Sequence, residues 1–269
     1  MKSILLSFFI SQLISSSLYA ALTFGVVPQQ SPLILIKSWT PVIQYLEKET
    51  GQKIDLKIES SISKFEEILY SGGYDIAYMN PYHYIVANEK KGYNSKIRDE
   101  KDLVGILVVN KNSNLNNIID IKDKNFLFAS ANAFAATLLT KYELSKKYNI
   151  YIDKNKTFTY VNSHDSVYKG IARGIGDVGG GIERTFNALD DMEVKESLKI
   201  LYKTQSYPSH PIAFNPSVSE DIQKRFVNAF MNIPKNLLED LNMIHIIKAD
   251  DATYDIVRDI AKELSLPKE

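Results

Sequence analysis

The sequence of 269 residues contains no cysteine at all. A chain without thiols forms no disulfide and offers no cysteine for lipid attachment, so we expect neither a disulfide-stapled fold nor a lipoprotein. Its charges also balance, because 32 Lys and Arg residues face 32 Asp and Glu residues and no basic block stands out. That balance is not typical of nucleic-acid or membrane-surface binding, so we expect no nucleic acid and a small molecule or a protein as the partner.

Long apolar runs are scarce, and the longest lies at the start, in "MKSILLSFFISQLISSSLYA". One early Lys, an apolar centre and a short polar stretch ending in Ala20 are typical of a secretory signal peptide over residues 1–20. Ser and Gln interrupt the run, which falls short of the roughly 18 to 20 residues that a membrane span needs. We therefore predict cleavage before Ala21 and a soluble periplasmic protein, with an uncleaved anchor as the alternative.

Motifs of catalysis and metal binding are missing as well. The sequence has no G-x-S-x-G elbow, no phosphate-binding P-loop and no H-E-x-x-H. Its four histidines, His83, His164, His210 and His245, lack the short spacing of metal ligands. We expect no enzyme, no cofactor and no metal site, while a metal-binding protein that uses His83, His164 and His210 remains an alternative.

What the sequence does contain is an alternation of strand-type and helix-type runs. Apolar residues recur at helical spacing before Gly51, and Ser63 with Glu66 three residues later predicts a capping box for the next helix. Asn80 and Pro81 predict the N-cap and first residue of another helix. The repeated strand-helix cycle predicts an α/β fold with mainly parallel sheets flanked by helices.

Length and one polar stretch suggest two lobes with a hinged cleft between them. "NKNSNLNN" begins at residue 110, where we expect the chain to enter a second lobe and later return near 201–207. The expected limits are 21–110 with 204–269 for the first lobe and 111–203 for the second, with hinges near 110 and 203.

Polar and aromatic residues gather at four expected strand-to-helix junctions, "VVPQQS", "YMNPYHY", "FASANAF" and "VNSHDS". Open α/β sheets bind ligands at such junctions, and a helix start attracts anions through its unpaired N–H groups and its dipole. Each signal also has a structural explanation, because Asn80, Asn132 and Ser163 are residues preferred as N-caps and His164 beside Asp165 could be a hydrogen-bonded pair.

The stretch "GIGDVGGG" matches the G-x-G-x-x-G spacing of dinucleotide sites. That fingerprint requires a strand before its first glycine and a helix at its last. Here a helical run precedes Gly174, which predicts that Gly174 ends this helix and that "DVGGG" leads into a strand. We interpret the match as accidental.

Six segments in order resemble the phosphate, phosphite and phosphonate substrate-binding proteins of ABC transporters, which have a type II periplasmic-binding-protein fold. They are "FGVVPQQS" with "WTPVIQYLEKETG", "YDIAYMNPYHYIVA", "FASANAFAATLLTKYEL", "VNSHDSVYKGIARGIGDVGGG", "YPSHPIAFNPSVSEDIQKRFVNAF" and "ADDATYDIVRDI". The resemblance covers nearly the whole chain after residue 20 and implies two α/β lobes that close over a small ligand.

The resemblance also implies roles for particular residues. The family's binding histidine corresponds to His164. Its oxyanion-gripping Ser-Thr-Ser-Gly run corresponds to Ala133-Phe134-Ala135-Ala136, which has no hydroxyl. Carboxylates that hold an aminoalkyl group correspond to Arg184 and His210, and a guanidinium suits a carboxylate or phosphate rather than an ammonium. We therefore expect a small oxyanion or anionic metabolite as the ligand.

The expected ligand-binding residues are Gln29, Gln30, Ser61, Asn80, Tyr82, Asn132, Phe134, His164, Arg184 and His210. We expect a monomer that delivers its ligand to an ABC permease of the inner membrane. A periplasmic sensing subunit that presents its ligand to a receptor or histidine kinase is the alternative, because both use the same closing clamp.

Overall fold

The structure is a computed structural model, and it describes residues 21–155 and 158–264. The predicted signal peptide at 1–20 lies outside the described residues. Within them, no helix combines the length and the apolar character that crossing a membrane requires.

The first lobe is built on a six-stranded sheet with the order β11-β4-β10-β3-β1-β2. Its strands are β1 (Leu22–Val26), β2 (Ile54–Ile58), β3 (Ile76–Tyr78), β4 (Asn94–Asp99), β10 (Pro211–Phe214) and β11 (Ile246–Lys248). β1 pairs in parallel with β2 and β3, whereas β10 is antiparallel to both of its neighbours.

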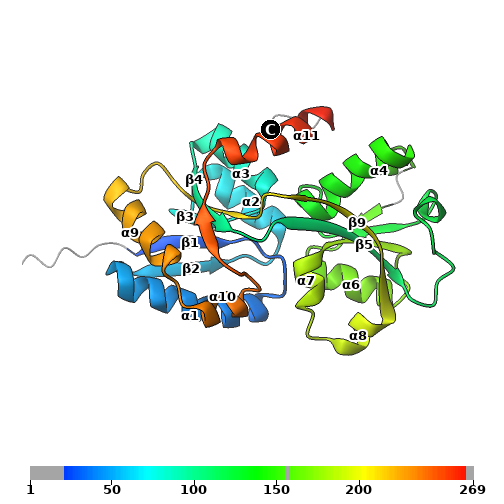
Figure 1. Ribbon diagram of the computed structural model, residues 1–269, viewed down its shortest axis with the longest axis horizontal. Helices are drawn as coiled ribbons and strands as arrows, with labels where there is room; N and C mark the ends of the chain where they lie inside the picture. The colour runs from blue at the N-terminus through cyan, green and yellow to red at the C-terminus, as the bar shows by residue number, and fades with distance from the viewer. Residues whose placement is uncertain (1–20, 156–157, 265–269) are drawn as a thin grey trace, which may run out of the picture.

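Helices cover both faces of this sheet (Figure 1). One face carries α1 (Pro32–Thr50), α9 (Glu220–Met231) and α10 (Lys235–Asp240); the other carries α2 (Ile62–Ser71), α3 (Pro81–Lys91), the short η3 (Ala252–Tyr254) and α11 (Asp255–Glu263). Phe24 of β1 packs against Trp39 of α1 and Phe230 of α9. The apolar spacing before Gly51 thus becomes the buried stripe of α1, as predicted.

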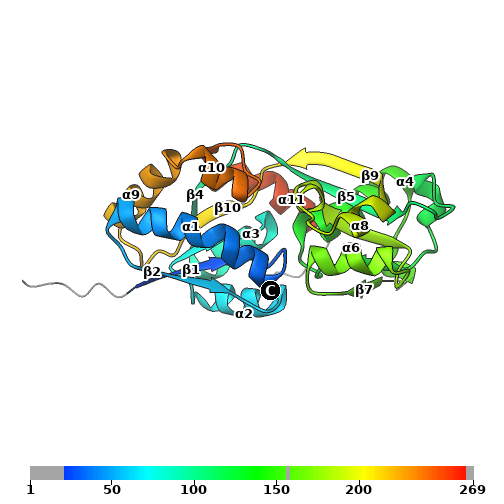
Figure 2. The same cartoon turned by 90° about the horizontal axis from the view of Figure 1, so that it is seen from below.

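The second lobe holds a five-stranded sheet with the order β7-β6-β8-β5-β9. Its strands are β5 (Leu103–Asn110), β6 (Phe126–Phe128), β7 (Phe158–Tyr160), β8 (Val178–Ile182) and β9 (Leu198–Tyr207). The π-helical turn η2 (Phe134–Leu139) and α4 (Thr140–Tyr148) lie on one face, and α6 (His164–Ala172), α7 (Glu183–Asn187) and α8 (Met192–Ser197) on the other (Figure 2). Two short segments, η1 (Ile118–Ile121) and α5 (Ile152–Asn155), complete the lobe.

Two expectations about the sheets need correction. The α/β architecture with two lobes is confirmed, but the sheets are mixed rather than mainly parallel, because β10 runs antiparallel to β3 and β4, and β5 runs antiparallel to β8 and β9. The lobe limits expected at 110 and 203 also differ from the points at which the chain passes from one sheet to the other. β5 and β9 pair with each other in the second sheet, so the chain passes between sheets at residues 100–102 and 208–210.

Most predicted helix ends are confirmed. Gly51, Gly72 and Gly174 adopt the left-handed conformation, with φ of 68°, 85° and 72°. The capping box at Ser63 is wrong: the N-cap of α2 is Ser61, whose hydroxyl accepts the N–H of Lys64. Buried Ile62 begins the apolar stripe of this helix, and the N-cap therefore lies two residues earlier than predicted.

The glycine-rich stretch has the predicted non-nucleotide arrangement. Helix α6 comes first, Gly174 follows its end, and the remaining glycines enter β8. A Cβ on Gly180 would stand 2.3 Å from the carbonyl oxygen of Ala136, and one on Gly181 would stand 2.2 Å from the Tyr168 hydroxyl. These glycines therefore let η2 and α6 pack closely onto β8.

Candidate ligand site between the lobes

A small cavity lies where the two lobes meet. It measures about 10 Å³, the room of about one water molecule. The first lobe contributes Val27, Gln29, Ile62, Asn80 and His210 to its lining, and the second lobe contributes Leu103, Ala133, Phe134, Ala135, Ala136, His164 and Ile182. Small ligands are often bound at such a position between two lobes.

Helix starts surround the cavity. Ile62 is the first residue of α2, Asn80 is the N-cap of α3, Ala133 precedes η2, and His164 is the first residue of α6. The first N–H groups of a helix have no partner within the helix, and their partial positive charge favours an anion. These starts come from both lobes, so their dipoles act together only when the lobes are in contact.

Two histidines in the lining are uncharged near neutral pH. Burial, together with the charge of Arg184, lowers the pKa of His164 from 6.5 to about 4. Burial and Arg184 likewise hold the pKa of His210 well below its ordinary value. In each ring Nδ1 is buried and has no hydrogen-bond partner within the described part of the chain. No group in the described part of the chain therefore occupies Nδ1 of either ring.

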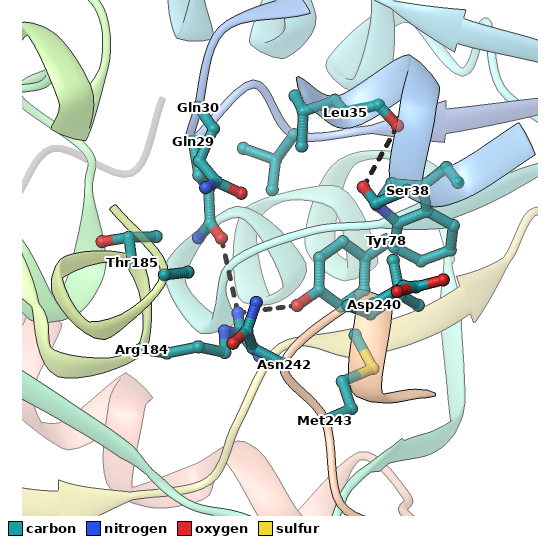
Figure 3. Close-up of a pocket in the computed structure, with 14 residues that line it drawn as sticks. Gln29, Gln30, Leu35, Ser38, Tyr78, Arg184, Thr185, Asp240, Asn242 and Met243 are labelled. Atoms are coloured by element: carbon teal, nitrogen blue, oxygen red, sulfur yellow. Dashed lines mark hydrogen bonds between the residues drawn. The ribbon is translucent and has the colours of Figure 1, made fainter. Parts of the chain in front are cut away.

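The guanidinium of Arg184 lies beside this cavity rather than in its lining. Its Nη2 donates to the Tyr78 hydroxyl at 2.7 Å and to Gln29 Oε1 at 3.3 Å (Figure 3). Its Nη1 stands 3.9 Å from Oδ2 of Asp99, a carboxylate that is 1 % exposed. Arg184 is thus held by protein groups from the first lobe and is compensated by a buried acid.

A second, adjoining cavity of about 30 Å³ shares lining residues with the first, and Figure 3 shows the residues that line it. Its lining comes from α1, β3, α7 and the segment after α10, and includes Gln30, Tyr78, Arg184 and Asn242. Gln29 and Val27 belong to both linings, so the Gln29 side chain forms part of the wall that separates the two spaces.

Direct hydrogen bonds join the lobes around the cavity. The backbone N–H of His164 donates to the carbonyl oxygen of Gln29 at 3.0 Å. Asn80 Nδ2 donates to the carbonyl oxygen of Asn132 at 3.0 Å. The Ser31 N–H donates to Oδ2 of Asp165 at 3.0 Å. The lobes are therefore closed upon each other in this structure.

The predicted site residues fall into three groups. Five line the small cavity: Gln29, Asn80, Phe134, His164 and His210. Gln30 and Arg184 line the adjoining cavity. The remaining three belong to neither lining: Ser61 is the N-cap of α2, Asn132 contacts Asn80 through its backbone, and Tyr82 is buried within α3.

Sequence reasoning missed Tyr78 and Asp99. The Tyr78 ring stacks on His210 with centroids 5.3 Å apart, and its hydroxyl accepts from Arg184. Tyr78 is the last residue of β3, at the carboxyl end of a strand that parallels β1, and that position alone could have drawn attention to it. Nothing in the local sequence marks Asp99.

The metal alternative finds no support in the geometry. Across the described ranges, no group of three or more His, Cys, Asp or Glu side chains is placed to hold a metal ion. Of the three histidines proposed for such a site, His164 and His210 line the cavity, whereas His83 does not and contacts Glu66 at 2.9 Å.

Two known periplasmic or transporter-associated binding proteins are similar to this chain over most of its length. The Phosphonates-binding periplasmic protein of Escherichia coli K12 is 25 % identical over 241 residues, covering 80 % of this chain and 67 % of its own length. The Probable ABC transporter phosphite binding protein PhnD1 of Prochlorococcus marinus MIT 9301 is 23 % identical and covers 98 % of this chain and 96 % of its own.

The solved structure of PhnD1 from Prochlorococcus marinus in complex with methylphosphonate has a similar fold. It superposes with a TM-score of 0.83 at 19 % identity, covering 91 % of this chain and 98 % of that chain. Residues 24–254 match the family described as ABC transporter, phosphonate, periplasmic substrate-binding protein. The chain therefore belongs to this family of periplasmic substrate-binding proteins of ABC transporters, and it is not an enzyme.

Proposed function

We propose that the protein captures a small oxyanion of the phosphite, phosphate or alkylphosphonate class in the cavity between its lobes. The observation that carries this proposal is the meeting of four helix starts from both lobes around a cavity whose two histidines are uncharged. The dipole of each helix start favours an anion, and a neutral imidazole can donate a hydrogen bond to an oxyanion. The names of the Escherichia coli and Prochlorococcus relatives point to the same class.

The lining argues for a compact ligand without an ammonium group. None of the residues that line the small cavity is Asp or Glu, so no carboxylate there could hold an ammonium. The backbone at Ala133–Ala136 supplies N–H donors without any hydroxyl. We therefore expect phosphite, phosphate and methylphosphonate to bind more tightly than 2-aminoethylphosphonate.

A thermal-shift and calorimetry panel tests this proposal. We expect phosphite, phosphate or methylphosphonate to raise the unfolding temperature, since a ligand present at 100 times its Kd stabilises the folded state by about 2.7 kcal/mol. Sulfate and 2-aminoethylphosphonate serve as comparison ligands. A transition that moves only with cations or nucleotides would contradict the proposal.

A matched pair of variants locates the binding. Ala135→Leu places a larger side chain in the cavity lining and should remove the ligand-induced shift. Ala131→Leu changes an exposed residue of the same junction and should retain it. If both variants respond to the ligand like wild type, binding takes place elsewhere.

We further propose that residues 100–102 and 208–210 form the hinge, that a signal peptide is removed before Ala21, and that a monomer delivers its ligand to an ABC permease. Mass spectrometry of the exported protein tests the cleavage, and size-exclusion chromatography with light scattering tests the monomer. Uptake of labelled ligand that requires both this gene and the permease would support transport. A kinase response without uptake would support the sensing alternative instead.

A further inference from the structure

The side-chain amide of Gln29 is held at both ends. Its Oε1 accepts a hydrogen bond from Arg184 Nη2 at 3.3 Å, and its Nε2 is in hydrogen-bond contact with Nε2 of His210. A guanidinium only donates, so the amide oxygen must face Arg184 and the amide nitrogen must face His210. The orientation of this amide thus follows from its partners rather than from an arbitrary assignment.

This orientation determines where the His210 proton lies. Because Gln29 Nε2 donates, Nε2 of His210 must accept, and a neutral ring then carries its proton on Nδ1. That nitrogen is buried and has no partner among residues 21–155 and 158–264. His210 lines the small cavity. We propose that Arg184 is a positioning residue that acts through Gln29 to hold His210 as the Nδ1–H tautomer, a neutral donor for the bound oxyanion.

Tyr78 and Asp99 keep Arg184 in this role. The Tyr78 hydroxyl accepts from Nη2 at 2.7 Å, while the Tyr78 ring stacks on the His210 ring. Asp99 stands 3.9 Å from Nη1 and balances the charge of the guanidinium. The arginine lines the adjoining cavity and is absent from the lining of the small one (Figure 3). It therefore affects the ligand through two intervening side chains.

Loss of the guanidinium should release the amide. Gln29 could then turn over and present Oε1 to Nε2 of His210, which would favour the Nε2–H tautomer. Nδ1 would then present a lone pair to the oxyanion instead of a proton, and a donor would become a repulsive acceptor. The deduction about the ligand rests on the function proposed above, whereas the tautomer can be measured without any ligand.

The first experiment measures the tautomer by long-range ¹⁵N–¹H correlation spectra of the ¹⁵N-labelled mature protein near pH 7. His210→Gln assigns the His210 signals. Wild type should show a protonated Nδ1 and an unprotonated Nε2, and Arg184→Met and Gln29→Met should each lose this pattern. Arg184→Lys retains a donor and should restore it in part. Arg225→Met removes an arginine that bonds to the Thr50 carbonyl on the first lobe, and it should leave the His210 signals unchanged.

The second experiment measures affinity for phosphite and methylphosphonate by calorimetry. Arg184→Met should weaken binding by about tenfold or more, the cost of one lost hydrogen bond, with Arg184→Lys intermediate and Arg225→Met like wild type. A wild-type Nε2–H tautomer, or an Nδ1–H tautomer that persists in Arg184→Met, overturns the proposal. Absence of any binding by wild type would instead overturn the proposed function, and the spectra would still decide the tautomer.

Discussion

The two walls of the cavity are built in different ways. The first lobe contributes polar side chains, Gln29, Asn80 and His210, and each is fixed by further hydrogen bonds. The second lobe contributes mainly the segment Ala133–Ala136, whose side chains are all apolar, with His164 as its polar side chain. Side-chain substitutions can therefore retune the first wall, whereas the second wall depends on the path of its main chain.

That path depends on glycines in the neighbouring strands. A Cβ on Gly105 of β5 would stand 2.3 Å from the carbonyl oxygen of Ala135, and a Cβ on Gly180 of β8 would stand 2.3 Å from that of Ala136. Both oxygens belong to η2, so the π-helical turn rests directly on the strand backbones. Backbone cannot move aside as easily as the end of a flexible side chain, and a methyl group here must displace the wall itself.

The largest expected effect therefore comes from Gly180→Ala. The added methyl group also meets the Phe128 ring at 2.4 Å, so we expect a loss of about 3 kcal/mol in the free energy of unfolding together with a severe loss of ligand affinity. Urea unfolding and calorimetry measure the two effects.

Gly174→Ala is the matched control for that substitution. Its Cβ would meet no atom within 4 Å, and only its φ of 72° opposes a side chain. We expect a loss of about 1 kcal/mol and unchanged affinity. Equal losses of affinity in the two variants would show that the second wall does not depend on close packing against β8.

The next largest effect is the pH dependence of the free energy of unfolding that His164 causes. The folded-state pKa of His164 is lowered to about 4, below its ordinary 6.5, so the unfolded chain binds more protons between these values. Stability from this residue is present above pH 6.5 and is lost as the pH falls toward 4. Between pH 7 and pH 5 the loss amounts to about 2 kcal/mol.

Urea unfolding at both pH values checks this expectation by comparing wild type with two variants. His164→Gln should flatten the pH dependence, and His245→Gln, which changes a side chain that is 58 % exposed, should not. If the His164→Gln curve keeps the wild-type slope, the imidazole is already charged in the folded protein.

Sequence patterns could predict the fold and the location of the cavity, because both depend on local signals. Asn80 and Ser163 are N-caps as expected, and the junctions that they mark converge between the lobes. The sequence could also have predicted the start of α2 correctly, since Ile62, Phe65 and Leu69 form an apolar stripe that begins before Ser63. These features need only a few neighbouring residues.

The surroundings of Arg184 could not be predicted in the same way. Its partners Gln29, Tyr78 and Asp99 come from separate elements of the other lobe, and they meet only when the lobes close. The antiparallel direction of β5 and β10 likewise depends on the passage of the chain between sheets. An isolated arginine in a sequence does not reveal whether its charge is already compensated.

A smaller effect on stability is expected from the N-cap residues of α3 in the first lobe and α6 in the second. Asn80 Oδ1 accepts the N–H of His83 at 2.8 Å, and its Nδ2 also reaches across to Asn132. Ser163 caps α6 in the same manner, through the N–H of Ser166 at 3.2 Å. Alanine at either position should cost about 1 kcal/mol of stability.

Asn80→Ala and Ser163→Ala should differ in their affinity for the ligand, although they lose similar amounts of stability. Asn80 lines the cavity and joins the lobes, so Asn80→Ala should weaken ligand binding by about tenfold, whereas Ser163→Ala should stay within about twofold of wild type. Calorimetry with phosphite or methylphosphonate measures both. Equal affinities would mean that neither the contact with Asn132 nor the Asn80 amide supports the closed state.

The smallest expected effect is a gain of ligand affinity from a substitution in the second wall. Ala135 lines the cavity at the start of η2, and serine there adds one hydroxyl donor with little added volume. One hydrogen bond to a charged ligand contributes about 1 kcal/mol after side-chain ordering, so Ala135→Ser should tighten oxyanion binding by about fivefold. Ala129→Ser adds the same hydroxyl at a buried position outside the lining and should not. Unchanged affinity in Ala135→Ser would show that this wall binds the anion through its backbone alone.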